Sequence, residues 1–210
     1  FQAEDGIRYL VRSRGLGDVY KRQVLCSGNG TNFENIVTNP LCNKHEVVLM
    51  IHNKEKCNAV KRAAKFGIPH IHIPHKNEDL MIRTIRAFAP DLIVLAGYMR
   101  ILSPRFVGSF ENIINVHPSL LPKFKGAHAV EQALESGDTE TGVTVHYVTE
   151  ELDSGEIILQ TKVPILPSDD VKSLTKAIQR VEYGILPQAI NLCASSETVP
   201  RVAHSDLRLL

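Results

Sequence analysis

The stretch Ile113-Ile114-Asn115-Val116-His117-Pro118-Ser119-Leu120-Leu121-Pro122 places a histidine directly after a short apolar run. The run has the pattern of a buried strand, and Pro118 ends that strand because proline has no N–H to donate. Asn115 and His117 are two residues apart, so their side chains leave the strand on the same face. Open α/β sheets carry their chemistry just beyond the carboxyl ends of strands. We therefore expect Asn115 and His117 to lie at a functional site.

Short apolar runs alternate with helical stretches on both sides of this strand. The strand candidates are Val24–Ser27, Val47–Ile51, Ile71–Ile73, Leu92–Ala96 and Ile113–Val116. The helix candidates between them are Asn32–Thr38, Asn58–Phe66 and Asp79–Phe88. Later, Gly142–Val148 and Ile157–Val163 have β patterns, and Val171 to about Cys193 has a long helical pattern. The order predicts an α/β fold: a mostly parallel twisted sheet with helices on both faces, then C-terminal β segments and a long closing helix.

The composition is that of an ordinary globular protein, with 43% hydrophobic and 22% charged residues. The 24 basic and 23 acidic residues leave no basic field of the kind that nucleic-acid-binding proteins use. The four cysteines have no C-x-x-C spacing, and we expect reduced thiols. No apolar run approaches the roughly 20 residues of a membrane span. We expect a cytoplasmic protein, a monomer or homodimer, that binds neither nucleic acid nor membrane.

Three segments divide the chain. Residues 1–23 fit no element that leads into the following strand and resemble translated sequencing-adapter text, so we expect a non-native extension. Residues 24–193 have the length and patterning of a single domain. Residues 194–210 are weakly patterned and form a tail.

A glycine-containing loop, Ser27-Gly28-Asn29-Gly30-Thr31-Asn32, lies between the first predicted strand and helix. Glycines let the backbone approach a ligand, and the free N–H groups at a helix start favour an anion. The spacing is not that of a P-loop, since no lysine follows the second glycine, and Phe33 occupies the place of a third dinucleotide-type glycine. The alternative is a plain strand-to-helix turn with a capping side chain. Its position on the same sheet as Asn115 and His117 favours phosphate binding.

A carboxylate follows downstream in Leu152-Asp153-Ser154-Gly155. An amide and a cationic imidazole can stabilise the negative oxygen that forms when an acyl-type group moves onto an amine. The imidazole can also carry the proton between the two nitrogens, and a nearby carboxylate favours its protonated form. Taken alone, His117 could equally be a structural histidine, and Asp153 a turn residue.

Five motifs together resemble the glycinamide ribonucleotide formyltransferases, the folate-dependent enzymes of purine synthesis. They are Ser27–Asn32, Leu95–Ser103, Asn115–Pro122, Thr144–Val148 and Leu152–Gly155, and the resemblance extends from Val24 to about Ala189. It implies an N-terminal half that binds the ribonucleotide phosphate and a C-terminal half that binds 10-formyltetrahydrofolate as co-substrate. It implies no metal.

The resemblance also implies roles for individual residues. The catalytic residues would be Asn115, His117 and Asp153, and the phosphate ligands Gly30, Thr31 and Asn32. The rest of the ribonucleotide would contact Gln179, Arg180, Val181 and Glu182. The folate pocket would be lined by Met99, Arg100, Ile101, Leu102, Asn115, Thr149, Glu150, Glu151, Leu152 and Asp153. The stretch after His75 is short for this family, and Lys76 is the nearest basic candidate for the folate tail.

Other functions remain possible at this point. The same three catalytic groups resemble those of formyltetrahydrofolate deformylase and of other folate-dependent formyltransferases, such as methionyl-tRNA formyltransferase. A folate- or nucleotide-binding module without activity is the non-enzymatic alternative. His70, His72 and His75 suggest a metal site, but no acidic or thiol partners are evident near them, and we expect none there.

Overall fold

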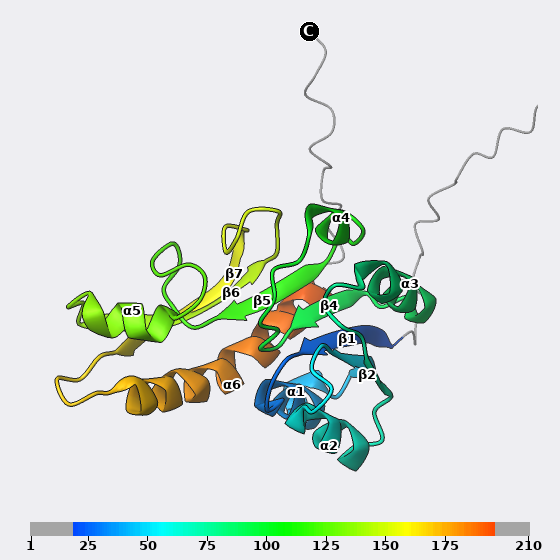
Figure 1. The fold of residues 1–210 in the computed structure, drawn as a ribbon. Helices are drawn as coiled ribbons and strands as arrows, with labels where there is room; N and C mark the ends of the chain where they lie inside the picture. The colour runs from blue at the N-terminus through cyan, green and yellow to red at the C-terminus, as the bar shows by residue number, and fades with distance from the viewer. Residues whose placement is uncertain (1–18, 196–210) are drawn as a thin grey trace, which may run out of the picture.

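The computed structural model describes residues 19–195, which form one seven-stranded sheet with helices against both of its faces (Figure 1). The strands are β1 Tyr20–Cys26, β2 His45–His52, β3 His70–His72, β4 Leu92–Leu95, β5 Ile113–His117, β6 Glu140–Tyr147 and β7 Ile157–Pro164. The helices are α1 Thr31–Thr38, η1 Pro40–Cys42, α2 Asn58–Lys65, α3 Glu78–Phe88, α4 Pro104–Val107, α5 Ala129–Glu135 and α6 Val171–Ser195.

The strand order in the sheet is β3-β2-β1-β4-β5-β6-β7. The first five strands in this order are parallel to one another. At one side of the sheet, β6 pairs antiparallel with β5, and β7 pairs antiparallel with β6. Helical crossovers connect the parallel strands, whereas a loop connects β6 to β7. The predicted fold class, with C-terminal β segments and a long closing helix, is confirmed.

The two faces of the sheet bury separate apolar cores. Val24 packs into the core that contains Phe33 of α1 and the buried side of α6, whereas the next residue, Leu25, packs into the core that contains Met81 of α3. Successive side chains of a strand point to opposite faces, so a strand that is apolar throughout is covered on both faces. Figure 1 shows α1, α2 and α6 on one face and α3 and α4 on the other.

The strand β1 begins earlier than predicted. The sequence pattern placed its start at Val24, but the strand starts at Tyr20, which pairs with His45. Tyr20, Arg22 and Gln23 are buried. The first residues of the strand were not predicted, because the buried arginine and glutamine interrupt the apolar run on which the prediction rested. Residues 1–18 and 196–210 lie outside the described residues, so most of the predicted extension and tail does too.

Two short α-helices, α4 and α5, and the 3-10 helix η1 were not predicted. Ser103 accepts a hydrogen bond from the Phe106 N–H, and Pro104 occupies the first turn, so α4 has the start signals of a helix despite its length. The seven-residue α5 is too short for a helical period to stand out. Within residues 19–195, no helix combines the length and apolar character needed to cross a membrane.

Candidate active site

The predicted site residues converge on the carboxyl edge of the parallel strands. The loop after β1 opens α1, the loop after β4 contains Met99–Leu102, and β5 ends at His117. The end of β6 pairs near the start of β5, and the loop that follows folds back so that Asp153 contacts His117. Segments far apart in the sequence therefore meet where an α/β sheet carries its ligands.

His117 is held between a carboxylate and a backbone carbonyl. Its Nδ1 lies 3.4 Å from Asp153 Oδ2, and both side chains are almost fully buried, with exposed fractions of 6% and 7%. Its Nε2 lies 2.8 Å from the carbonyl oxygen of Phe124. A carbonyl only accepts hydrogen bonds, so Nε2 carries the hydrogen in this contact. The imidazolium, which donates at both nitrogens, satisfies both contacts at once.

Asp153 is fixed by donors on three sides. Its Oδ2 accepts a hydrogen bond of 2.8 Å from the Gly126 N–H, and its Oδ1 lies 3.5 Å from His146 Nε2. Burial would raise the pKa of this carboxyl group, but the bonds from His146 and Gly126 and the charge of His117 outweigh burial and lower the pKa. Asp153 is therefore a carboxylate at neutral pH.

His146 belongs to the same network. It pairs with Asn115 across β5 and β6, and Asn115 Nδ2 lies 3.4 Å from its Nε2. Its Nδ1 donates to the Tyr147 carbonyl oxygen at 2.8 Å. Asn115, His117 and Asp153, which the sequence predicted, thus lie together with a second buried histidine. The cross-strand register is the only signal that could have revealed it, and the sequence does not give the register.

Backbone geometry explains the motif around Asp153. This residue has a φ of 47°, in the left-handed region. At Gly155, a Cβ atom would lie 1.8 Å from the Tyr147 carbonyl oxygen. Only glycine fits at that position, and the close approach turns the loop back toward β5.

The predicted phosphate loop has the geometry of an anion site. Gly30 precedes α1 with a φ of 69°, and a Cβ there would lie 2.6 Å from Ala59 Cβ of α2. No side chain among residues 19–195 caps α1, so the N–H groups of its first turn lack a side-chain acceptor. Thr31 and Asn32 begin the helix at this point, as expected for ligands of a phosphate.

Asn32 joins this loop to the last helix. Its Nδ2 donates to Glu182 Oε2 of α6 at 2.9 Å, although 150 residues separate the two in the chain. Burial raises the pKa of the Glu182 carboxyl group, and the bond from Asn32 only partly opposes the shift. Asn32 Oδ1 is buried and has no hydrogen-bond partner among residues 19–195. A buried carboxyl group and an unsatisfied amide oxygen therefore lie next to the helix start.

The other predicted residues of α6 differ in position. Gln179 and Arg180 are exposed, whereas Val181 packs against the core. Gln179 lies three residues before Glu182 and so shares its side of the helix. The structure thus brings Glu182 to the phosphate loop and directs the Val181 side chain into the core instead.

Two loops border the predicted folate region. Met99 and Ile101 are large apolar side chains that are 69% and 78% exposed, whereas Leu102 is buried. The loop with Thr149–Asp153 exposes another large apolar side chain, Leu152, whose Cδ2 would lie 3.5 Å from a Cβ at Gly126. Exposed apolar side chains of this kind suit contact with a flat organic ligand. Arg100 and Lys76 are also exposed.

The hydrogen bonds of Lys125 were not predicted. Its Nζ donates to Ser154 Oγ and lies 3.6 Å from Glu151, so it ties the loop after β5 to the loop that carries Asp153. Within residues 19–195, no group of three or more His, Cys, Asp or Glu side chains is arranged to hold a metal ion.

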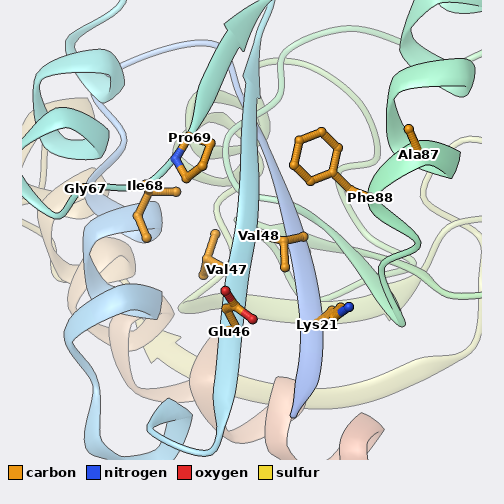
Figure 2. Close-up of a pocket in the computed structure, with 9 residues that line it drawn as sticks. All are labelled: Lys21, Glu46, Val47, Val48, Gly67, Ile68, Pro69, Ala87 and Phe88. Atoms are coloured by element: carbon orange, nitrogen blue, oxygen red, sulfur yellow. The ribbon is translucent and has the colours of Figure 1, made fainter. Parts of the chain in front are cut away.

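A cavity of about 430 Å³ lies at the opposite edge of the sheet, near the start of β2 (Figure 2). Lys21, Glu46 and Phe88 are among its lining residues, and it contains none of the predicted site residues. The cavity is therefore separate from the candidate active site.

Known proteins resemble this chain in sequence and in fold. Residues 20–190 match the formyl transferase family. A phosphoribosylglycinamide formyltransferase of Escherichia coli K12 is 42% identical over 178 residues, which are 80% of this chain and 84% of the relative. A trifunctional purine biosynthetic protein of Drosophila pseudoobscura pseudoobscura is 44% identical over 184 residues, and this chain spans only 14% of its length.

The fold resembles the crystal structure of phosphoribosylglycinamide formyltransferase from Anaplasma phagocytophilum. The TM-score is 0.81 at 36% identity, and the match covers 85% of this chain and 88% of the other. The match in sequence and the match in fold agree. The chain belongs to the formyl transferase family.

Proposed function

We propose that this protein transfers a formyl group from 10-formyltetrahydrofolate to the amine of glycinamide ribonucleotide, a step of purine synthesis. The observation that carries the proposal is the joining of two sites at one sheet edge. A half-buried amide and a buried imidazole and carboxylate lie at the same edge of the sheet as the start of α1, whose N-cap makes no side-chain hydrogen bond within residues 19–195. The relatives named phosphoribosylglycinamide formyltransferase support the same activity.

The catalytic cluster has the groups that this transfer needs. The amine nitrogen attacks the formyl carbon, a tetrahedral carbon with a negative oxygen forms, and the bond to folate N10 then breaks. Asn115 and protonated His117 are the donors for the negative oxygen. The imidazolium gives its Nε2 proton to N10 as the bond between N10 and the formyl carbon breaks, and the neutral imidazole then takes the proton that the former amine loses. Asp153 stabilises the imidazolium through Nδ1.

The contact between His117 Nε2 and the Phe124 carbonyl bears on this role. Asp153 occupies Nδ1, so a substrate oxygen can reach only Nε2, and the Phe124 carbonyl must first give way. The loop that carries Phe124 is therefore expected to shift when substrate binds.

The acceptor is proposed to bind at the start of α1. Its phosphate would accept hydrogen bonds from the N–H groups and side chains of Gly30, Thr31 and Asn32. Glu182 would bind the ribose or the glycyl amine, and Gln179 lies on the same side of α6. Arg180 and Val181 remain weaker candidates for this contact.

The donor is proposed to lie between Met99–Leu102 and Thr149–Asp153. The exposed apolar side chains of these loops suit the flat pteridine ring, whose polar edge meets backbone groups. Lys76 is proposed as a contact of the folate tail. We expect the reaction to need no metal and to take place in the cytoplasm.

The second candidate is a formyltetrahydrofolate deformylase, in which water replaces the amine. The free helix start and the buried Glu182 favour a phosphorylated acceptor over water. The test is to follow tetrahydrofolate formation from 10-formyltetrahydrofolate with and without glycinamide ribonucleotide. Formation that requires the ribonucleotide supports the proposal, whereas an equal rate without it would identify a deformylase.

A further inference from the structure

Ser27 lies within the glycine loop, yet its hydrogen bonds run to the loop after β4. Its N–H donates to the Gly97 carbonyl oxygen at 3.1 Å, and its Oγ accepts from the Met99 N–H at 2.8 Å. Ser27 is 1% exposed, so water cannot replace either bond. These two bonds fix the backbone at the start of Met99–Leu102.

The same loop is fixed at its other end by Glu78 of α3. Glu78 Oε1 accepts from the Ser103 N–H at 2.9 Å, and Oε2 accepts from the Ser103 hydroxyl. Met99 and Ile101 lie between these two attachment points, with most of their surface exposed. The segment between Gly97 and Ser103 is thus held at both ends while its apolar side chains stay open to a ligand.

The phosphate loop itself has different supports. Arg62 of α2 donates from Nε to the Asn29 carbonyl oxygen at 2.8 Å and forms an ion pair with Glu34 of α1. Asn58 Nδ2 donates to Asn29 Oδ1 at 3.0 Å. The backbone that presents Gly30 and Thr31 therefore depends on α2, and not on the side chain of Ser27.

We propose that Ser27 is a positioning residue for the folate-binding segment Met99–Leu102, although it belongs by sequence to the phosphate motif. The inference rests on the proposed function and deepens it, because it assigns adjacent residues to different substrates. Ser27 serves the formyl donor, and Gly30, Thr31 and Asn32 serve the acceptor. Removal of the Ser27 hydroxyl, which is itself buried, takes away the acceptor of the Met99 N–H, and the segment then loses its defined position.

The test compares Ser27→Ala with Arg62→Gln in the full chain. For Ser27→Ala we expect the KM for 10-formyltetrahydrofolate to rise about tenfold, the scale of one buried N–H left unsatisfied, while the KM for glycinamide ribonucleotide changes less than about twofold. Arg62→Gln should raise the KM for glycinamide ribonucleotide and leave the KM for 10-formyltetrahydrofolate almost unchanged. Ser109→Ala is the matched control, because the Ser109 hydroxyl bonds only within its own turn, to Arg105, and both KM values should stay unchanged.

Two further measurements separate positioning from general loss of structure. Ser27→Cys keeps the volume but has a weaker acceptor, so its folate KM should fall between those of the wild type and Ser27→Ala. The Kd for tetrahydrofolate, measured by calorimetry without any acceptor, should rise in the same order. This binding measurement remains informative even if the wild type transfers no formyl group to glycinamide ribonucleotide, a result that would overturn the proposed function alone.

Three results would overturn the inference. They are an unchanged folate KM and Kd in Ser27→Ala, equal increases of the two KM values, and an increase of the ribonucleotide KM alone. If Ser27→Ala does not fold, Ser27→Cys decides by the same criteria.

Discussion

Asp153 is the residue on which the catalytic assignment depends most. It is a buried carboxylate with a lowered pKa, and it contacts both His117 and His146. Asp153 is far from His117 in the sequence, and the fold of the loop between β6 and β7 brings the two side chains together. The roles of the two histidines follow from this carboxylate, because it decides which nitrogen of His117 faces the substrate.

Asp153→Asn keeps the shape of the side chain and removes the charge that stabilises the imidazolium. We expect turnover to fall by about 10² or more, the usual scale for the loss of a proton-transfer partner. The KM values should change little, because the carboxylate acts mainly in the transition state. Steady-state kinetics with both substrates measure this, with Asp79→Asn as the control, since that side chain is 60% exposed. Near-normal turnover of Asp153→Asn would mean that the assignment is wrong.

At the scale of elements, β1 is the strand whose sequence agrees least with its position. Arg22 and Gln23 are buried in a strand that pairs with β2 and β4. Both side-chain polar atoms of Gln23, and two nitrogens of Arg22, have no hydrogen-bond partner among residues 19–195. Such groups cost stability.

Gln23→Met removes two unsatisfied polar atoms and keeps the length of the side chain. We expect the free energy of unfolding to rise by about 1–2 kcal/mol, measured by urea denaturation. The matched control is Gln160→Met, because Gln160 Nε2 donates to the Leu121 carbonyl and to Thr144 Oγ1. That change should lower stability. A loss of stability in Gln23→Met would show that Gln23 is satisfied in solution.

The start of β1 also sets a limit for truncation. We propose that residues 1–18 are dispensable, and we expect a chain that begins at Val19 to keep its melting temperature and activity. A chain that begins at Val24 loses the residues that pair with His45, Glu46 and Val47, so it should melt at a lower temperature. Thermal denaturation of the two chains tests this. Equal melting temperatures would restore the boundary at Val24 that the sequence suggested.

At the scale of the molecule, α6 connects the C-terminal part of the chain to the phosphate loop through Glu182. Burial raises the pKa of this carboxyl group, so the folded state holds its proton to a higher pH than the unfolded state does. The stabilising effect is therefore present below the ordinary pKa of glutamate and is lost as pH rises through the raised value. A buried ionisable group that lowers stability when it loses its proton is expected at a site that binds a ligand.

Glu182→Gln tests this in the unliganded protein. The variant cannot ionise, so it should melt at a higher temperature than the wild type near pH 8 and at about the same temperature near pH 4, below the ordinary pKa of glutamate. It should also bind glycinamide ribonucleotide more weakly. A difference in melting temperature that does not depend on pH would contradict the raised pKa.

The fold class could be predicted from the sequence, because the period of the apolar residues distinguishes strands from helices and the two kinds of element alternate along the chain. Asn115 and His117 could be predicted as site residues because both lie on one strand. The roles of three other residues could not be predicted from the sequence. That of His146 depends on cross-strand register, that of Phe124 on its backbone carbonyl, and that of Ser27 on hydrogen bonds between separate loops. Val181 was assigned by its neighbours in the sequence, and the helical turn directs it into the core instead.

In the proposed function, the catalytic cluster and the phosphate loop act on one acceptor molecule. The most direct measurement is kcat/KM for glycinamide ribonucleotide and for its dephosphorylated riboside, in the wild type and in Thr31→Val combined with Asn32→Ala. The wild type should prefer the phosphorylated acceptor by about 10² or more, since buried donors without a partner penalise the riboside. The double variant should lose most of this preference with little change in the folate KM. Equal kcat/KM values for the two acceptors in the wild type would contradict the account.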